Sequence, residues 1–120
     1  MPELDEITLT LPPDRDFHRV AHLVLGGLAV RHELTIETLE DLQLALSTVL
    51  EHAPPSRDVT VTLTMHDGTL EASVGPVDVA GALDAGDEDS LSTRRILWTV
   101  VDEVKLDGNY VRLLKRIDRP

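Results

Sequence analysis

The sequence contains no cysteine, which excludes disulfides, thiolate metal sites and catalysis by a cysteine nucleophile. Aromatic residues are nearly as scarce, because Phe17, Trp98 and Tyr110 are the only ones. Apolar residues still make up 42% of the 120 residues, which is in the globular range. We therefore expect a single domain, residues 1–120, whose core consists of leucine, valine, isoleucine and alanine.

Basic residues are also few, and the net charge is −11. A chain of this charge repels a polyanion, so we expect no nucleic-acid partner. A partner protein with a basic surface would be attracted to it. The acidic N-terminus lacks the pattern of a signal peptide. The longest apolar stretch, Leu23 to Val30, is too short to span a bilayer. These features predict a cytoplasmic protein without membrane contact.

Alternating apolar and polar residues predict several strands. Residues 7–11 show this pattern first, and residues 59–65 and 70–74 repeat it on either side of Asp67-Gly68. Asp-Gly between two such runs is a strong hairpin signal. Residues 110–117 form the last predicted strand.

Three other segments place apolar residues at spacings of three and four, which predicts amphipathic helices. The first runs from Asp14 to about Arg31, the second runs from Ile36 to Ala53 with Thr35 as its N-cap, and the third runs from about Ser90 to Val104. Gly26-Gly27 lies inside the first helix. Either close packing against another backbone or a break in the helix would explain this pair.

The predicted order is β-α-α-β-β-loop-α-β, with residues 75–89 as a long loop that is either functional or mobile. Such an order predicts an α/β (α+β) protein. Its fold would be a two-layer sandwich with three helices on one face of a mixed or antiparallel sheet of four to five strands.

This order resembles the anti-sigma-factor serine kinases, the compact branch of the histidine-kinase-like ATPases (the GHKL or Bergerat fold). Residues 39–47 look like the lead-in to the family's Asn-containing motif, and residues 67–74 look like the hairpin before its Asp-x-Gly-x-Gly motif. Residues 101–117 look like its last helix and strand. The resemblance implies this fold, with an ATP pocket and a protein-binding surface.

The residues that handle nucleotide in the family are replaced here. Its second helix carries a Glu as general base and, one turn later, an Asn for Mg²⁺, whereas this chain has Thr48 and His52 at those positions. Thr48 cannot act as a carboxylate base, and Mg²⁺ prefers oxygen to the ring nitrogens of His52. Pro76 stands at the family's adenine-binding Asp and Asp78 at a glycine, although a gap would let Asp78 take the Asp role.

The family's last motif is a Gly-x-Gly-Leu turn that opens the final helix and holds phosphate on backbone N–H groups. The matching positions begin at Leu91 and include neither glycine. Ser92, Thr93 and Arg94 near a helix N-terminus could still bind an anion, and a capped helix start with exposed arginines is the alternative. The remnant nucleotide site would thus comprise His52, Asp78, Ser92, Thr93 and Arg94, with Thr48 at the general-base position.

Two further features invite a functional interpretation. His18 and His22 have the spacing of zinc ligands on a helix, but nearby residues do not complete a site, so we expect no metal. Trp98 is either an anchor for a partner or a residue at the edge of the core.

These observations predict an anti-sigma-factor-like regulator that acts by protein binding, with no catalytic residue and no cofactor. The partner would be a sigma factor or an anti-anti-sigma (STAS-type) protein, and homodimerisation is left open. The alternative is an active ATP-dependent serine kinase that uses ATP and Mg²⁺, in which Asp78 and His52 stand in for the lost ligands.

Overall fold

The computed structural model describes residues 5–78 and 88–117, with side chains from residue 93 onward in the second range. Helices and strands alternate along the chain much as the sequence predicts. They are β1 (Asp5–Leu11), the 3-10 helix η1 (Arg15–Phe17), α1 (His18–Arg31), α2 (Ile36–Leu50), β2 (Val59–His66), β3 (Thr69–Gly75), α4 (Glu88–Val100), β4 (Glu103–Asp107) and β5 (Tyr110–Arg116).

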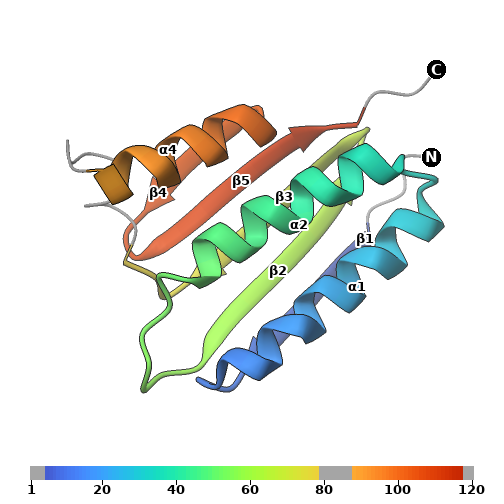
Figure 1. Ribbon diagram of the computed structural model, residues 1–120. Coiled ribbons are helices and arrows are strands. Elements are labelled where there is room, and N and C mark those ends of the chain that lie inside the picture. The colour runs from blue at the N-terminus through green and yellow to red at the C-terminus, as the bar shows by residue number, and fades with distance from the viewer. Residues whose placement is uncertain (1–4, 79–87, 118–120) are drawn as a thin grey trace.

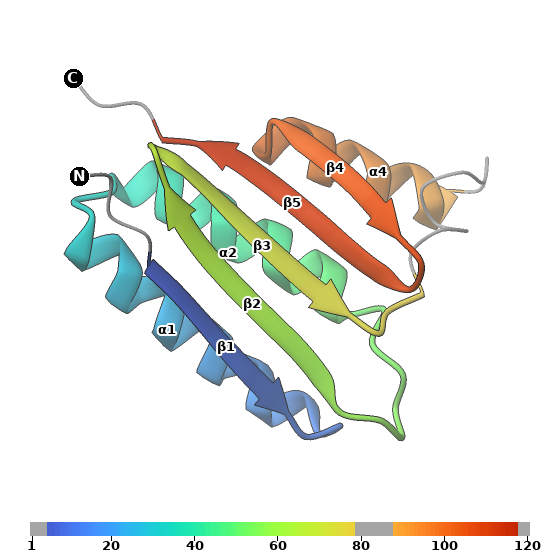
Figure 2. The same ribbon diagram turned by 180° about the vertical axis from the view of Figure 1, so that it is seen from behind.

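The five strands form one sheet in the order β1-β2-β3-β5-β4, and every neighbouring pair is antiparallel. The sheet is therefore antiparallel throughout, and the mixed alternative is excluded for the described strands. The helices α1, α2 and α4 cover one face, and the other face is open (Figures 1 and 2). This arrangement confirms the predicted two-layer sandwich.

The core lies between the helices and the sheet, and α2 packs against both other helices. Its largest side chains are aliphatic, as the shortage of aromatic residues requires. Those with almost no exposed surface include Leu25, Leu46, Leu50, Leu63, Leu70, Leu97 and Val111.

The N-cap residue and the Asp-Gly turn correctly predicted the start of the second helix and the position of the hairpin. The Thr35 hydroxyl accepts a hydrogen bond from the Thr38 backbone N–H at 3.1 Å, which confirms the N-cap. At the tip of the hairpin Asp67 and Gly68 have φ angles of 49° and 72°, as a two-residue type I′ turn requires. Asp14 also caps as expected, but it begins η1 rather than α1.

The predicted end of the third helix is wrong. The helix α4 ends at Val100 instead of Val104, and Glu103–Asp107 forms the edge strand β4. Val104 and Leu106 alternate with polar residues, so a strand pattern is present, but it is too short to be separated from the preceding helical pattern. Similarly, α2 ends at Leu50 rather than Ala53.

Gly26 and Gly27 break no helix, because α1 continues through both. A Cβ atom built on either glycine would meet no atom within 4 Å, so close packing within the described chain does not explain the pair either. Residues 79–87 of the predicted loop lie outside the described residues. None of the described helices is long and apolar enough to cross a membrane.

Candidate functional site

The C-terminal end of α2 and the turn after it hold Thr48 and His52, which the sequence resemblance predicts at the base and metal-ligand positions. Thr48 is buried, and its hydroxyl donates to the Leu44 carbonyl oxygen of the same helix at 2.7 Å. His52 lies just beyond the helix, in a tight turn in which its N–H bonds to the Val49 carbonyl. The Thr48 hydroxyl is therefore hydrogen-bonded within α2. His52 was expected on the same helix, one turn after Thr48, but α2 ends at Leu50 and does not include it.

His52 links α2 to two other segments. Its Nε2 atom lies 3.4 Å from the Thr93 hydroxyl of α4, and its carbonyl oxygen accepts from the Asp78 N–H at 3.1 Å. The Asp78 side chain itself is exposed. The structure thus brings His52, Thr93 and Asp78 together, although only the backbone of Asp78 takes part.

Backbone hydrogen bonds hold the segment after β3 in place. Besides the Asp78 bond, the Val77 N–H donates to the Asn109 carbonyl at 2.8 Å, and the Val77 side chain is buried. Gly75 lies under the Tyr110 ring, which a Cβ on this glycine would meet at 2.5 Å. This segment, which would carry the family's adenine contact, is therefore fixed against both β5 and the end of α2.

The anion site stays a prediction, and its residues lie further into the last helix than expected. The helix α4 begins at Glu88, so Ser92, Thr93 and Arg94 lie beyond its first turn. The unpaired N–H groups that bind anions belong to the first turn of a helix. Arg94 is exposed, Thr93 is turned to His52, and the side chains of Leu91 and Ser92 lie outside the described residues.

His22 on α1 makes a second polar contact with α2. Its Nε2 atom lies 2.8 Å from the Ser47 hydroxyl, so the half-buried ring joins the two helices. Burial lowers the pKa of His22, and the neighbouring His18 lowers it further. No group of three or more His, Asp or Glu side chains suited to a metal occurs among the residues that the structure describes.

Acidification is expected to destabilise the protein through His22. Because burial lowers its pKa in the folded state, the unfolded chain binds more protons below the ordinary value of about 6.5. The free energy of unfolding should therefore fall as the pH drops below about 6.5. The fall should stop once the pH is below the lower pKa of His22 in the folded state. Urea unfolding at several pH values measures this slope. His22→Gln should reduce it, and an unchanged slope would contradict the assignment.

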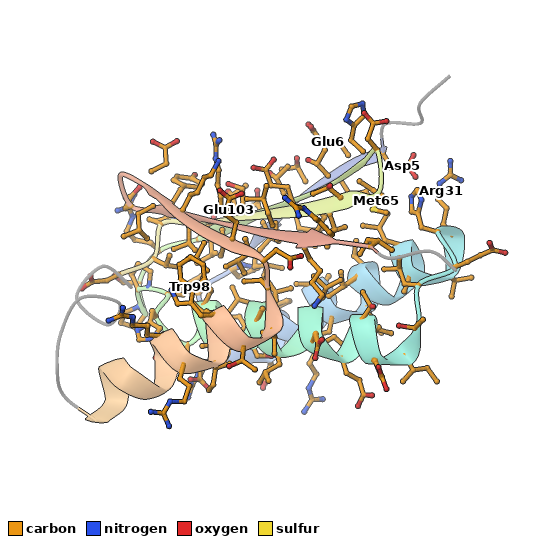
Figure 3. All side chains as sticks on the ribbon, turned by 90° about the horizontal axis from the view of Figure 1, so that it is seen from above. Asp5, Glu6, Arg31, Met65, Trp98 and Glu103 are labelled. Carbon is orange, nitrogen blue, oxygen red and sulfur yellow. The ribbon has the colours of Figure 1, made fainter. Side chains whose placement is uncertain are left out.

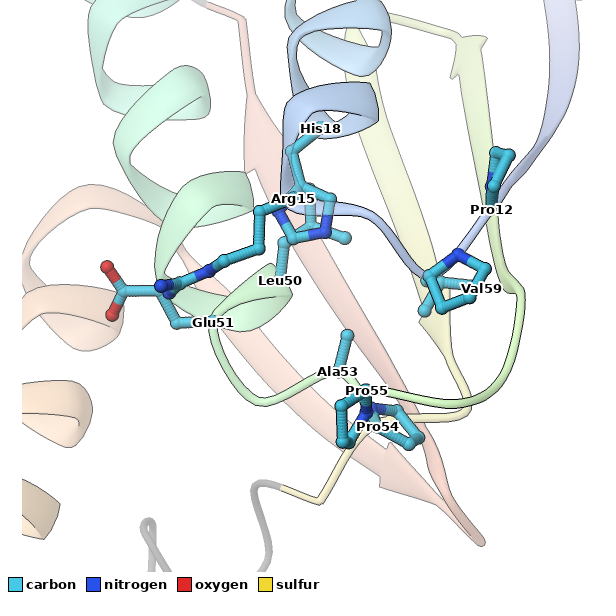
Figure 4. A pocket seen from close by; sticks show the side chains of 10 residues that line it. Pro12, Arg15, His18, Leu50, Glu51, Ala53, Pro54, Pro55 and Val59 are labelled. Atoms are coloured by element: carbon cyan, nitrogen blue, oxygen red, sulfur yellow. The ribbon is translucent and has the colours of Figure 1, made fainter.

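A separate cavity of about 360 Å³ opens at the end of β1, on the other side of the α2 terminus (Figure 4). Pro12, Pro13, Pro54 and Pro55 form much of its wall, with Arg15 and His18 beside them. None of the residues predicted for the nucleotide site lines it. The cavity and the predicted site are therefore different places.

Trp98 is 51% exposed on α4, so about half of its surface is open to a partner, and both the anchor and the edge-of-core interpretation stay predictions (Figure 3). Its neighbour Leu97 is fully buried and packs α4 onto the core, whereas about half of the Trp98 side chain is exposed at the surface. Exposed tryptophans are enriched among the residues that dominate protein–protein binding.

Comparison with known proteins finds a match among solved structures but not among family models or curated proteins. No family model and no curated protein matches the chain. Among solved structures the chain is similar to the crystal structure of the RsbU and RsbW domains of Rv1364c from Mycobacterium tuberculosis, with a TM-score of 0.68 and 18% identity. The match covers 97% of this chain and 33% of that one, so this chain spans about a third of its length. At this identity the likeness concerns the fold alone.

Proposed function

We propose that this chain is an anti-sigma-factor-like regulator that acts by protein–protein binding and transfers no phosphate. In the cytoplasm it would bind a sigma factor or a STAS-type anti-anti-sigma protein, and it would pair with a second copy of itself. The fold similarity to a structure that includes an RsbW domain supports the regulatory class.

One observation carries the non-catalytic part of the proposal. At the two positions where the family has its base and its metal ligand, this chain has Thr48, whose hydroxyl is bonded within α2, and His52, which contacts Thr93. Neither residue supplies the carboxylate or the amide oxygen that the family's chemistry uses. A protein-binding surface does not need those groups, because its affinity comes from buried apolar and charged contacts.

Titration with Mg·ATP tests this proposal against the active-kinase alternative. We expect no saturable heat in isothermal calorimetry, and no transfer of labelled phosphate to sigma factors or STAS-type proteins. A matched double variant, Thr48→Glu with His52→Asn, restores the family's pair of residues. It shows whether the fold can still bind nucleotide when those residues are present. Micromolar binding by the wild-type chain, with phosphate transfer to a protein, would overturn the proposal.

Replacement of Trp98 by alanine is expected to weaken partner binding. Loss of a central tryptophan anchor usually costs about 2 kcal/mol or more, which is roughly a 30-fold increase in the dissociation constant. Trp98 is half-exposed, so the fold should survive the change. The matched control is Ile36→Ala, because Ile36 is also an exposed apolar residue, at 75%, and it lies on α2.

Binding is measured with purified sigma factors and STAS-type proteins from the same organism, by surface plasmon resonance. If Trp98→Ala and Ile36→Ala bind equally well, α4 is not the contact surface. If the wild-type chain binds none of these proteins, the partner class itself is wrong.

A further inference from the structure

The side of the molecule formed by α4 and β4 carries exposed apolar residues. Trp98 on α4 is 51% exposed and Leu106 on β4 is 44% exposed, and Val104 of the same strand is half-buried. Scattered exposed apolar side chains are ordinary, but neighbouring ones beside an unpaired strand mark a contact surface. We refer to Trp98, Val104 and Leu106 as the edge patch.

The two strand residues of the edge patch lie on the face of the sheet that the helices cover. Leu106 is paired with Val111 of β5, a fully buried core residue. Val104 is likewise paired with the buried Leu113. Paired residues point to the same face of a sheet, and α4 lies over this face of β4 (Figures 1 and 2).

Trp98 reaches the same level as these strand residues. Only Val101 and Asp102 join α4 to β4, so the helix and the strand run in opposite directions from a common level. Trp98 lies about 5 Å back along the helix, and its side chain leans toward the helix N-terminus. Val104 lies about 7 Å along the strand. Figure 3 shows the Trp98 side chain projecting from α4 toward the strands, so the edge patch is continuous.

The backbone of β4 is open to another strand. Among the described strands β4 pairs only with β5, so the N–H and C=O groups along its other edge have no partner strand. An edge of this kind can receive a strand from another chain. The strand has five residues and carries charges at alternate positions, and both features protect an edge from non-specific pairing. A strand that adds here must therefore match those charges.

The charges of β4 lie on the open face of the sheet in the order acidic, basic, acidic. They are Glu103, Lys105 and Asp107, which alternate with the apolar residues of the strand. Lys105 is paired with Arg112 of β5, so two cations stand opposite each other. The Lys105 Nζ atom lies 3.7 Å from the Glu103 Oε1 atom, but this pair is exposed and contributes little. A carboxylate on the outer side of Lys105 would offset the repulsion between the two cations.

The same charges disfavour a second copy of β4 as the added strand. In a full antiparallel pairing, Lys105 would face Lys105 of the second copy, and Glu103 would face Asp107. Like charges directly opposite each other destabilise a sheet. A register shifted by two residues would bring opposite charges together, but it would pair only the short stretch from Glu103 to Lys105. The edge therefore fits a strand of another sequence.

We propose that this edge binds an extended segment of a partner protein, which adds to β4 as a strand of about five residues. The side chains of the segment alternate in the order basic, apolar, acidic, apolar, basic. The apolar ones pack on the edge patch, and the charged ones face Glu103, Lys105 and Asp107. This order is the same in both directions, so it fits a parallel or an antiparallel strand. The inference rests on the partner binding proposed above and adds the surface and the chemistry of the partner.

The expected contact is small. The strand β4 is about 17 Å long, so one added strand buries less than the roughly 1,200 Å² that separates transient from lasting interfaces. A short peptide should therefore bind weakly, with a dissociation constant on the order of 100 μM. Nuclear magnetic resonance detects binding of this strength and shows which backbone amides it affects.

Two capped peptides test the charge pattern by titration of the isotope-labelled chain. The peptide Lys-Val-Glu-Val-Lys matches β4, and Lys-Val-Lys-Val-Lys has the wrong central charge. Because the chain has a net charge of −11, non-specific attraction alone favours the second, more basic peptide. We expect the first peptide to bind at least about tenfold more tightly and to shift the amide signals of β4. Lys105→Glu should reverse this preference.

Three further variants test the edge patch with the first peptide. Trp98→Ala and Leu106→Asn should each weaken its binding at least about fivefold. The matched control is Leu44→Asn on α2, because Leu44 is 46% exposed and Leu106 is 44% exposed. This control should leave the binding unchanged. All three side chains are largely exposed, so the variants should fold, which circular dichroism checks.

The outcomes separate this inference from the proposed function. Tighter binding of the more basic peptide by both the wild-type chain and Lys105→Glu would overturn the edge, and so would amide shifts confined to elements other than β4 and α4. If sigma factors or STAS-type proteins bind the wild-type chain and Lys105→Glu equally well, the proposed function stands and the edge is wrong. If the peptides bind as expected and none of those proteins binds, the edge stands and the partner class is wrong.

Discussion

Gly75→Ala is expected to lower the free energy of unfolding by about 2 to 3 kcal/mol, as overpacking usually does. A Cβ atom at this position would meet Cγ, Cδ1 and Cδ2 of the Tyr110 ring at 2.5, 2.7 and 2.6 Å. These carbons lie at or next to the base of the ring, so the side chain cannot avoid the methyl group by a small movement of its tip. Urea unfolding followed by circular dichroism measures the loss.

The Tyr110→Ala background shows whether the ring is the cause. Without the ring, Gly75→Ala should cost less than about 0.5 kcal/mol, so the two changes should be strongly coupled. Tyr110 is 37% exposed, and its own replacement should therefore leave the protein folded. An equal loss in both backgrounds would show that the glycine is needed for its backbone rather than for the ring.

Leu46→Ala is expected to lower the free energy of unfolding by about 3 kcal/mol, since it leaves a cavity in a closed core. Leu46 is 1% exposed on α2, the helix that packs against both α1 and α4. A loss of this size should lower the melting temperature by about 10 °C. Differential scanning calorimetry measures both quantities.

The matched control lies two residues away on the same helix. Leu44→Ala removes the same atoms from a side chain that is 46% exposed, and it should change stability by less than about 0.5 kcal/mol. Alanine favours helix at least as well as leucine, so helix propensity cannot cause a loss in either variant. If both variants lose equal stability, burial does not determine the effect, and the packing of α2 described above is wrong.

Elements with a local signal could be predicted from the sequence. The turn at Asp67-Gly68 needs positive φ angles that Asp and Gly tolerate, and the Thr35 cap is satisfied by a residue three positions away. Neither depends on the rest of the fold. The edge strand β4 was missed because five residues with an exposed outer edge carry too little alternation to compete with a preceding helical pattern.

The sequence names candidate residues but carries no information on their contacts. The resemblance puts Thr48, His52, Asp78 and Thr93 at the family's nucleotide-handling positions, and their role in nucleotide binding stays a prediction. The contact between His52 and Thr93 joins residues 41 positions apart, and periodicity carries no information about such a pair. The same holds for His22 and Ser47, which meet only because α1 and α2 pack together.

The place of β5 in the sheet has a consequence for biosynthesis. This strand follows the other described strands along the sequence, yet it lies between β3 and β4 in the interior of the sheet. While the ribosome is still adding residues 110–116, β3 has an open edge and α4 has no completed sheet beneath it. The two halves of the sheet therefore cannot finish folding one after the other, and the unpaired β3 edge is exposed to aggregation until residues 110–116 have been made.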